Sequence, residues 1–247
     1  DVEEIRRLLN AVEALVVPDD YDRRTPYIPI TEYAYPEETE KYLAYISEWI
    51  DEEDYSDLSK NLIKLCIINS LERCSFTIKS GQYLSWDSRS LKVQLANEKR
   101  SREGKKLIPE KTVREEIERI DQVIVEELRH CIEDIVSIQG VAENVRNAEI
   151  EYINDSVLFN LPEMNDGILK GVITSPPYCN RYDYTRTYAL ELVYLGLDDN
   201  KVKDLRQKLL SCTVESKSKK SMLEQYYISI GAQERYEYIR RVISENG

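Results

Sequence analysis

The chain has 247 residues, of which 42% are hydrophobic, so it is long enough for one large globular domain or two small ones. Its net charge of −12 argues against a protein that coats nucleic acid indiscriminately. It also lacks an apolar run near the roughly 18 residues that a membrane-spanning helix needs. No secretory signal opens the sequence, and its five scattered cysteines form no CxxC pair, which predicts a cytoplasmic protein with reduced thiols.

The first 148 residues are expected to form a mostly helical region. Apolar residues recur at helical spacing over residues 2–16, 42–49 and 58–68, and Pro18 ends the first of these patterns. The most regular stripe covers residues 113–138, where apolar positions follow one another in steps of three and four. We therefore predict several amphipathic helices, of which the longest covers residues 113–138.

The single histidine, His130, lies with Cys131 on or beside the apolar stripe of the longest predicted helix. One histidine nearly excludes a His-based triad or a multi-histidine metal site, and no metal is expected. We predict that both side chains pack in the core or at its rim.

Two stretches are basic although the chain as a whole is acidic. Residues 92–111 contain seven basic and three acidic side chains, and residues 201–220 contain seven basic and two acidic ones. Each stretch is either a set of solvated loops and helix faces or a local surface that contacts phosphate groups. Charge alone does not decide between these interpretations.

The pattern changes near residue 149. Residues 149–153 alternate between apolar and polar side chains and end at the turn signature Asn154-Asp155-Ser156. A second, buried-looking strand is predicted at residues 171–175, and the segment between the two has the length of a helical crossover. The spacing favours a βαβ unit with parallel strands.

The last part of the chain is again expected to be helical. Tyr188, Leu192 and Leu195 share one face of a predicted helix, and Gly196 suits its C-terminal cap. Two further helical patterns follow, around residues 202–210 and from Met222 to the end of the chain.

The most unusual stretch is Gly171–Asn180, GVITSPPYCN, in which a predicted strand stops against two prolines. Two successive prolines remove two backbone donors and fix two φ angles, so they hold a stiff elbow at the carboxyl end of the strand. Ligands of open α/β sheets bind at such ends. The Ser175 hydroxyl and the carbonyl after it can accept hydrogen bonds from a planar amine, and the Tyr178 ring can stack on a flipped base. The plain alternative is that Ser175–Tyr178 is only a loop.

Several stretches resemble one enzyme family. ITSPPY at residues 173–178 resembles the (Ser/Asp/Asn)-Pro-Pro-(Tyr/Phe) motif of the amino-methylating DNA methyltransferases, which take their methyl group from S-adenosylmethionine. YINDSVLFNLPE at residues 152–163 resembles the segment before that motif, and residues 75–90 and 180–197 resemble stretches of a bacterial subgroup. The serine in first place is more similar to the cytosine-N4 branch of the family than to the adenine-N6 branch.

The resemblance implies roles for the residues of the elbow. Ser175 and the carbonyl of Pro176 would accept hydrogen bonds from the target amine, and Pro177 would help to fix the backbone. Tyr178 would stack on the target base. Asp155, at the end of the first predicted strand, would lie near the adenine of S-adenosylmethionine.

Polar side chains directly after the elbow are expected to meet the DNA. They are Asn180, Arg181 and Arg186. For the two arginines, a salt bridge to Asp183 or Glu191 is the alternative.

The expected fold is therefore α/β, with part of a Rossmann-like methyltransferase sheet in residues 149–247. Residues 1–148 would form a large helical region that serves as a target-recognition insert, and residues 92–111 would touch phosphates. Residues 80–90, which contain a glycine and two aromatic residues, form either a β-turn over the core or part of the DNA-facing surface.

The sequence departs from the family in one respect. The glycine-rich loop, typically Asp-Pro-(Phe/Pro)-x-Gly-x-Gly, which holds the methionine end of the cofactor, does not occur among these 247 residues. A middle fragment of a longer methyltransferase is the first explanation, a split enzyme with a complementary subunit the second, and a decayed homologue the third.

We predict a site-specific DNA methyltransferase of a restriction-modification system, whose partner is double-stranded DNA with a flipped base and which has no contact with a membrane. The main alternative is a catalytically inactive DNA-binding or assembly module derived from such an enzyme. A methyltransferase that acts on RNA or on protein amides and a helical interaction protein without a nucleic-acid role are further alternatives.

Overall fold

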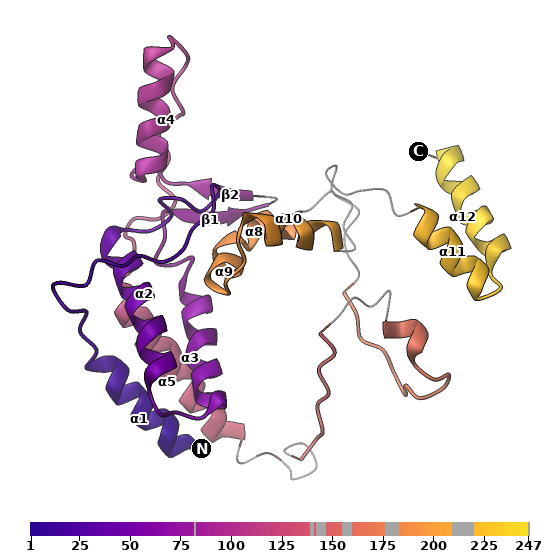
Figure 1. Cartoon of the computed structure of the whole chain (residues 1–247), viewed down its shortest axis with the longest axis horizontal. Coiled ribbons are helices and arrows are strands. Elements are labelled where there is room, and N and C mark those ends of the chain that lie inside the picture. The colour runs from indigo at the N-terminus through magenta and orange to yellow at the C-terminus, as the bar shows by residue number, and fades with distance from the viewer. Residues whose placement is uncertain are drawn as a thin grey trace.

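The structure is a computed structural model, and it describes residues 1–81, 83–138, 141, 147–154, 160–175, 183–208 and 220–246. Its first half consists of five helices and one hairpin (Figure 1). In chain order these are α1 (Val2–Glu13), α2 (Glu37–Glu52), α3 (Asp57–Ser70), β1 (Thr77–Ser80), β2 (Tyr83–Trp86), α4 (Leu91–Arg102) and α5 (Ile120–Ile138).

Four of these helices, α1, α2, α3 and α5, pack side by side, and we call them the helical body (Figure 1). Fully buried aliphatic side chains fill the space between them; among these are Leu8, Leu43, Ile46, Ile63, Ile67, Ile124 and Leu128. The helices begin where the sequence offers caps. Asp1 accepts a hydrogen bond from the Glu3 amide at the start of α1, and Ser56 accepts one from the Ser59 amide at the start of α3.

The helices predicted over residues 2–16, 42–49 and 58–68 are confirmed as α1, α2 and α3. The apolar residues of α3 differ in burial. Leu58 and Leu65 are 81% and 50% exposed, whereas Ile63 and Ile67 have no exposed surface. The side of α3 that carries Ile63 and Ile67 packs in the core, where α1, α2 and α5 all contact α3.

The long helix predicted over residues 113–138 begins only at Ile120, as α5. Hydrogen bonds from other segments occupy the backbone that the missing turns would need. The Val113 amide donates to Asp87, and the Arg89 guanidinium donates to the carbonyls of Arg114 and Glu115. These tertiary bonds outweigh the local helical pattern.

The two residues singled out on this helix differ in burial. His130 is exposed on α5, so the expectation that it packs in the core or at its rim is wrong. Cys131 is half-buried, and its Sγ lies 3.8 Å from the Sγ of the buried Cys66. Cys66 and Cys74 are core residues as predicted, with no exposed surface.

The segment at residues 75–90 forms an antiparallel hairpin, in which Thr77 is opposite Trp86 and Ser80 is opposite Tyr83. Gly81 has a φ of +61° in the connecting turn, a conformation that favours glycine. The interpretation of residues 80–90 as a turn is confirmed to this extent, although the two strands themselves were not predicted.

The two strands predicted after residue 148 are not confirmed. Residues 149–153 and 171–175 are not part of a sheet, and the only sheet in the described part of the chain is β1–β2. The expected burial of residues 171–175 is wrong as well, because Val172 and Ile173 are 73% and 104% exposed. A strand persists only where its amide and carbonyl groups have partners, and the described residues provide none here, so the Rossmann-like sheet is not confirmed.

The second half contains short elements. They are the 3₁₀ turn Leu161–Glu163 and the helices α8 (Tyr184–Thr187), α9 (Ala189–Tyr194), α10 (Asp199–Lys208), α11 (Lys220–Ser229) and α12 (Gln233–Asn246). Gly196 ends α9 with a φ of +85°, so its predicted role as a cap is confirmed. Of the residues on the predicted helix face, Tyr188 and Leu195 cap the two ends of α9 and are exposed, while Leu190, outside that face, is buried. Among the described helices, none combines the length and the apolar composition needed to cross a membrane.

Candidate functional site

The elbow itself lies mostly outside the described residues. Pro176, Pro177, Tyr178, Asn180, Arg181 and the proposed cofactor contact Asp155 all belong to the segments that the structure does not describe. Ser175 is described, and it is exposed at the end of an extended segment. The structure therefore leaves the roles predicted for the elbow residues untested.

The chain after the elbow is fixed in place by Asp183, which is 8% exposed. Its Oδ1 caps α8 by accepting hydrogen bonds from the amide and the hydroxyl of Thr185, at 3.1 and 2.7 Å. Its Oδ2 lies 3.1 Å from Nε of Arg206, on α10. One buried carboxylate thus joins the start of α8 to α10, five residues after Tyr178 in the sequence.

Arg186 takes part in the same cluster. Its Nε lies 3.3 Å from Oδ2 of Asp183, which is one of the two salt bridges named as the alternative to DNA contact. The side chain of Arg186 remains 42% exposed. A contact with DNA stays a prediction for this residue.

α8 and α9 lie against the helical body and the hairpin (Figure 1). Leu190 is buried in the core, and the Tyr194 hydroxyl lies 3.1 Å from the Ser47 hydroxyl on α2. On the hairpin side, Lys79 donates a 2.5 Å hydrogen bond to Glu191. The helices that follow the elbow are therefore anchored on the first half of the chain.

Lys79 is surrounded by carboxylates. It lies 3.5 Å from Glu72 as well as 2.5 Å from Glu191, and its ammonium group stands 4.5 Å from the centre of the Tyr188 ring. Burial alone would lower the pKa of Lys79, but the hydrogen bond to Glu191 and the charges of both carboxylates raise it above its ordinary value. The open hollow beside these residues, of about 450 Å³, also contains Glu127. Its acidic lining does not suit a phosphate group, so we assign this cluster to anchoring.

A second feature rises from the hairpin. α4 projects away from the helical body, and residues 103–112, which we call the return segment, run back along it (Figure 1). We call residues 88–112 the α4 arm. Asp87 lies at its base with no exposed surface. It accepts hydrogen bonds from the Arg89 side chain and amide and from the amide of Val113, the residue that follows the arm in the sequence and lies back at its base.

The charge of Asp87 is stabilised at this position. The hydrogen bond from the Arg89 side chain outweighs the effect of burial and, with the two backbone amides, holds the pKa of Asp87 well below its ordinary range. The two ends of the arm are joined further by the Ser88 amide, which donates to the Lys111 carbonyl at 2.8 Å. The arm therefore leaves the hairpin and returns to it through a closed base.

Hydrogen bonds also join the two sides of the arm, α4 and the return segment, along its length. The Asn97 side chain accepts a 2.7 Å hydrogen bond from the Ile108 amide and donates one to the carbonyl of the same residue. Nearer the tip, the Arg100 guanidinium donates to the Lys106 carbonyl at 2.6 Å. These bonds hold the return segment against α4.

Sequence reasoning missed both the clamp at Asp87 and the anchor at Lys79. A local signal existed for the first, because Asp-Ser-Arg-Ser before an apolar helical pattern is typical of a helix start, and Ser90 does cap α4. No local signal exists for the pair Lys79–Glu191, whose members are 112 positions apart.

The described residues beside Asp155 show no site for S-adenosylmethionine. The segments on either side of Asp155, residues 147–154 and 160–175, are exposed almost throughout and form no cradle for a nucleoside. Within the described ranges, no group of three His, Cys, Asp or Glu side chains is placed to hold a metal ion. The chemistry expected of the elbow therefore rests on its sequence motif.

The chain is similar to curated type II methyltransferases. It is 45% identical over 232 residues to the type II methyltransferase M.BsoBI of Geobacillus stearothermophilus, a match that covers 94% of this chain and 45% of that protein. It is 34% identical over 217 residues to the type II methyltransferases M.AvaI of a Nostoc strain and of Anabaena variabilis, which covers 87% of this chain and 42% of each relative.

No protein-family model and no solved structure matches the chain. The chain spans a little under half the length of the curated relatives, so the match concerns one portion of each of them. The resemblance of the chain to DNA methyltransferases is confirmed by these matches, and the roles of the elbow residues stay predictions.

Proposed function

We propose that this chain is part of a site-specific DNA methyltransferase that transfers a methyl group from S-adenosylmethionine to an exocyclic amine, with cytosine N4 favoured over adenine N6. One observation carries the proposal. The sequence Ser-Pro-Pro-Tyr at residues 175–178 lies inside a chain that is similar to type II methyltransferases over 94% of its length.

In this proposal the elbow holds the target base. The hydroxyl of Ser175 and the carbonyl of Pro176 accept hydrogen bonds from the exocyclic amine, and Tyr178 stacks on the base after it leaves the duplex. Preorganised hydrogen-bonding groups of this kind contribute several kcal/mol to a transfer step, typically about 3 kcal/mol for each group. Fixed prolines and the anchored helix α8 support this preorganisation.

The polar residues after the elbow take the next position along the DNA. Asn180, Arg181 and Arg186 contact the flipped nucleotide or the phosphates beside it. The helical region, residues 1–148, reads the target sequence. The anchoring of α8 and α9 on this region supports the last point, since it holds the helices that follow the elbow in the sequence against the region proposed to read the target.

A catalytically inactive DNA-binding or assembly module is the second candidate. It is favoured by one feature of the sequence, the lack of a glycine-rich cofactor loop among the 247 residues. In an active enzyme, that loop belongs to another part of the same protein or to a complementary subunit.

The test uses a protein of the full length of the relatives that contains this chain. Purified protein is incubated with DNA and S-adenosylmethionine, and methylated nucleosides are measured by mass spectrometry. We expect N4-methylcytosine, and we expect Ser175→Ala to lower its rate of formation about 100-fold because the amine loses one preorganised acceptor. The matched control is Thr174→Ala, which removes a neighbouring hydroxyl and should change the rate by less than about threefold.

Three outcomes decide the proposal. N6-methyladenine in place of N4-methylcytosine would keep the methyltransferase and reverse the choice of base. Equal rates for the wild type and Ser175→Ala would show that the elbow is structural. No methylated nucleoside from a protein that includes the glycine-rich loop would favour the inactive module.

A further inference from the structure

The α4 arm combines three properties. It projects from the helical body (Figure 1), it is closed at its base around Asp87, and residues 92–111 carry seven basic side chains against three acidic ones. The rest of the chain is acidic on balance, since the whole molecule has a net charge of −12, although residues 201–220 are also basic. A basic projection on an acidic molecule concentrates positive potential at one place.

Some cations of the arm serve its own structure. Lys92 donates to the Pro29 carbonyl and lies 4.6 Å from the centre of the Trp86 ring, and Arg100 donates to the Lys106 carbonyl. Arg102 pairs with Glu98 at 3.4 Å, and Lys105 pairs with Glu103 at 2.8 Å.

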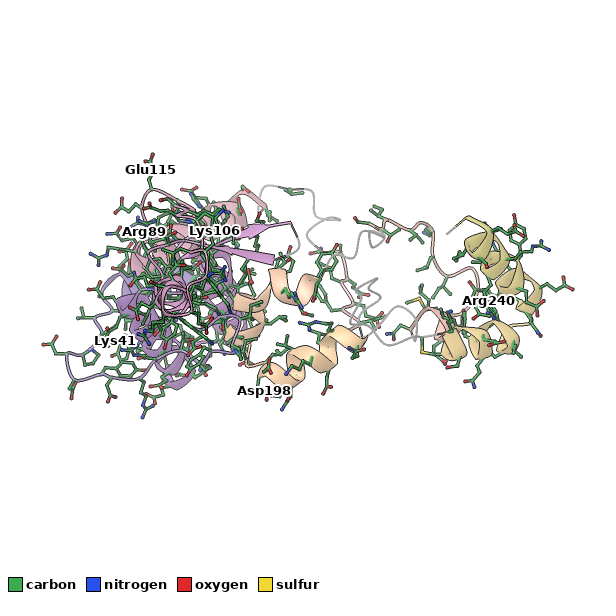
Figure 2. All side chains as sticks on the ribbon, turned by 90° about the horizontal axis from the view of Figure 1, so that it is seen from above. Lys41, Arg89, Lys106, Glu115, Asp198 and Arg240 are labelled. Atoms are coloured by element: carbon green, nitrogen blue, oxygen red, sulfur yellow. The ribbon has the colours of Figure 1, made fainter. Side chains whose placement is uncertain are left out.

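Three further lysines of the arm are exposed and, unlike Arg102 and Lys105, make no ion pair within the described residues. In the part of the chain that the structure describes, no carboxylate lies within 4.0 Å of the ammonium groups of Lys99, Lys106 or Lys111. Lys99 belongs to α4 and the other two to the return segment, so they lie on both layers of the arm. Figure 2, which views the molecule along the arm, labels Lys106. These three lysines are available for a polyanion.

We propose that the α4 arm docks on double-stranded DNA and that Lys99, Lys106 and Lys111 contact its phosphates. This inference rests on the proposed function, which makes duplex DNA the substrate. It adds a second DNA-contacting surface, the α4 arm, at a distance from the target base. It also names the three lysines of that surface that contact phosphates.

The dimensions of the arm favour the major groove side of a duplex. α4 has 12 residues and is therefore about 18 Å long, and with its side chains a helix is about 10 Å wide. The return segment adds a second layer along one face. Such a body is too wide for the minor groove, of about 6 Å, whereas the major groove, of about 12 Å, admits a helix edge with phosphates on either side.

A membrane surface suits the arm less well than DNA. An interfacial helix needs its apolar side chains on one face, but Val93 of α4 is buried toward the hairpin while Leu91 and Leu95 are 45% and 42% exposed on another side. The ties from Asn97 to Ile108 give the arm a fixed shape before any ligand binds. A preorganised surface loses less conformational freedom on docking than a flexible basic loop does.

The experiment measures the affinity of the 247-residue chain for a fluorescein-labelled DNA duplex by anisotropy, over salt concentrations from about 50 to 200 mM. The test variant is Lys99→Gln/Lys106→Gln/Lys111→Gln. The matched control is Lys41→Gln/Lys60→Gln/Lys64→Gln, which makes the same change in net charge on α2 and α3; Lys41 is labelled in Figure 2. The three arm lysines are exposed, and the three control lysines are half-buried on α2 and α3.

We expect the arm variant to bind about tenfold or more weakly at low salt and to lower the slope of log K against log salt by about three. The control should bind within about twofold of the wild type. Asn97→Ala, which loosens the return segment but changes no charge, should weaken binding with an unchanged salt slope.

Equal losses for the two triple variants would overturn the proposal, because they would show only general electrostatic attraction. It would also be overturned if the wild-type chain did not bind the duplex, or if it bound anionic phosphatidylserine vesicles as tightly and through the same three lysines. Methylation by the longer protein is measured separately, so a failure of the arm and a failure of the proposed function give different results.

Discussion

The helical body and the segment that leads to the elbow differ in what covers their apolar side chains. In the helical body Ile124 has no exposed surface, and it is packed among four helices. In the elbow segment Ile173 is 104% exposed, and its neighbour Val172 is 73% exposed. Both segments are rich in β-branched residues, so composition alone does not explain the difference.

The difference teaches that the two segments need different partners. The helices of the body find their apolar partners within residues 1–138, and they close a core without the second half of the chain except for a few residues of α9. Residues 171–175 have the composition of a buried strand, yet the described residues include no strand that pairs with them. Their apolar side chains therefore need packing partners other than the described residues.

The sharpest test of this contrast makes the same Ile→Ala substitution in both segments. Ile124→Ala removes fully buried atoms and should lower the free energy of unfolding by about 2–5 kcal/mol, because it adds a cavity to the loss of burial. Ile173→Ala, which makes the same change at an exposed position, should alter it by less than about 0.5 kcal/mol. Urea denaturation of the 247-residue chain measures both values. A similar loss for the two variants would show that residues 171–175 are covered in solution.

A smaller effect is expected at the clamp that joins the hairpin, the arm and the segment before α5. Asp87→Asn removes the charge from a buried group that accepts hydrogen bonds from Arg89 and Val113, which should cost about 2 kcal/mol at pH 7. The control is Asp134→Asn on the exposed side of α5, for which less than about 0.5 kcal/mol is expected.

The effect of Asp87 should depend on pH in one direction. Its pKa is depressed in the folded protein, so its ionised form stabilises the fold above the ordinary aspartate pKa of about 3.9. That stabilisation is lost as the pH falls from there through the folded pKa. The difference between the wild type and Asp87→Asn should therefore shrink below about pH 4. A difference that stays constant with pH would contradict the assignment of the charge to this clamp.

The sequence predicted the helices better than it predicted anything held by long-range contacts. α1, α2 and α3 follow from dense apolar periodicity, and Gly196 follows from the need for a positive φ after α9. The start of α5 was predicted too early, because the Asp87 and Arg89 bonds that replace its first turns come from a different segment. The buried side of α3 depends on which helices pack around it, and a local sequence pattern carries no information about those neighbours.

The candidate site was predictable only as a sequence motif. Ser-Pro-Pro-Tyr identifies itself by its residue types, whereas the anchors of the following helices depend on pairs distant in sequence, such as Lys79 with Glu191. Asp183 was named only as a partner for an arginine, and it proved to join α8 to α10 as well. Strand pairing at residues 171–175 was predicted from composition, but pairing requires neighbours that composition cannot specify.

We propose that this chain holds the base-side elbow of a methyltransferase site together with a helical body that packs mostly within residues 1–138, and that the cofactor side is not among these 247 residues. Titration calorimetry of the 247-residue chain with S-adenosylmethionine tests it most directly. We predict no binding tighter than about millimolar, because the sequence contains no glycine-rich cofactor loop and the described residues beside Asp155 form no cradle. Saturable binding at micromolar concentrations would contradict the claim, since it would require a cofactor site within these 247 residues.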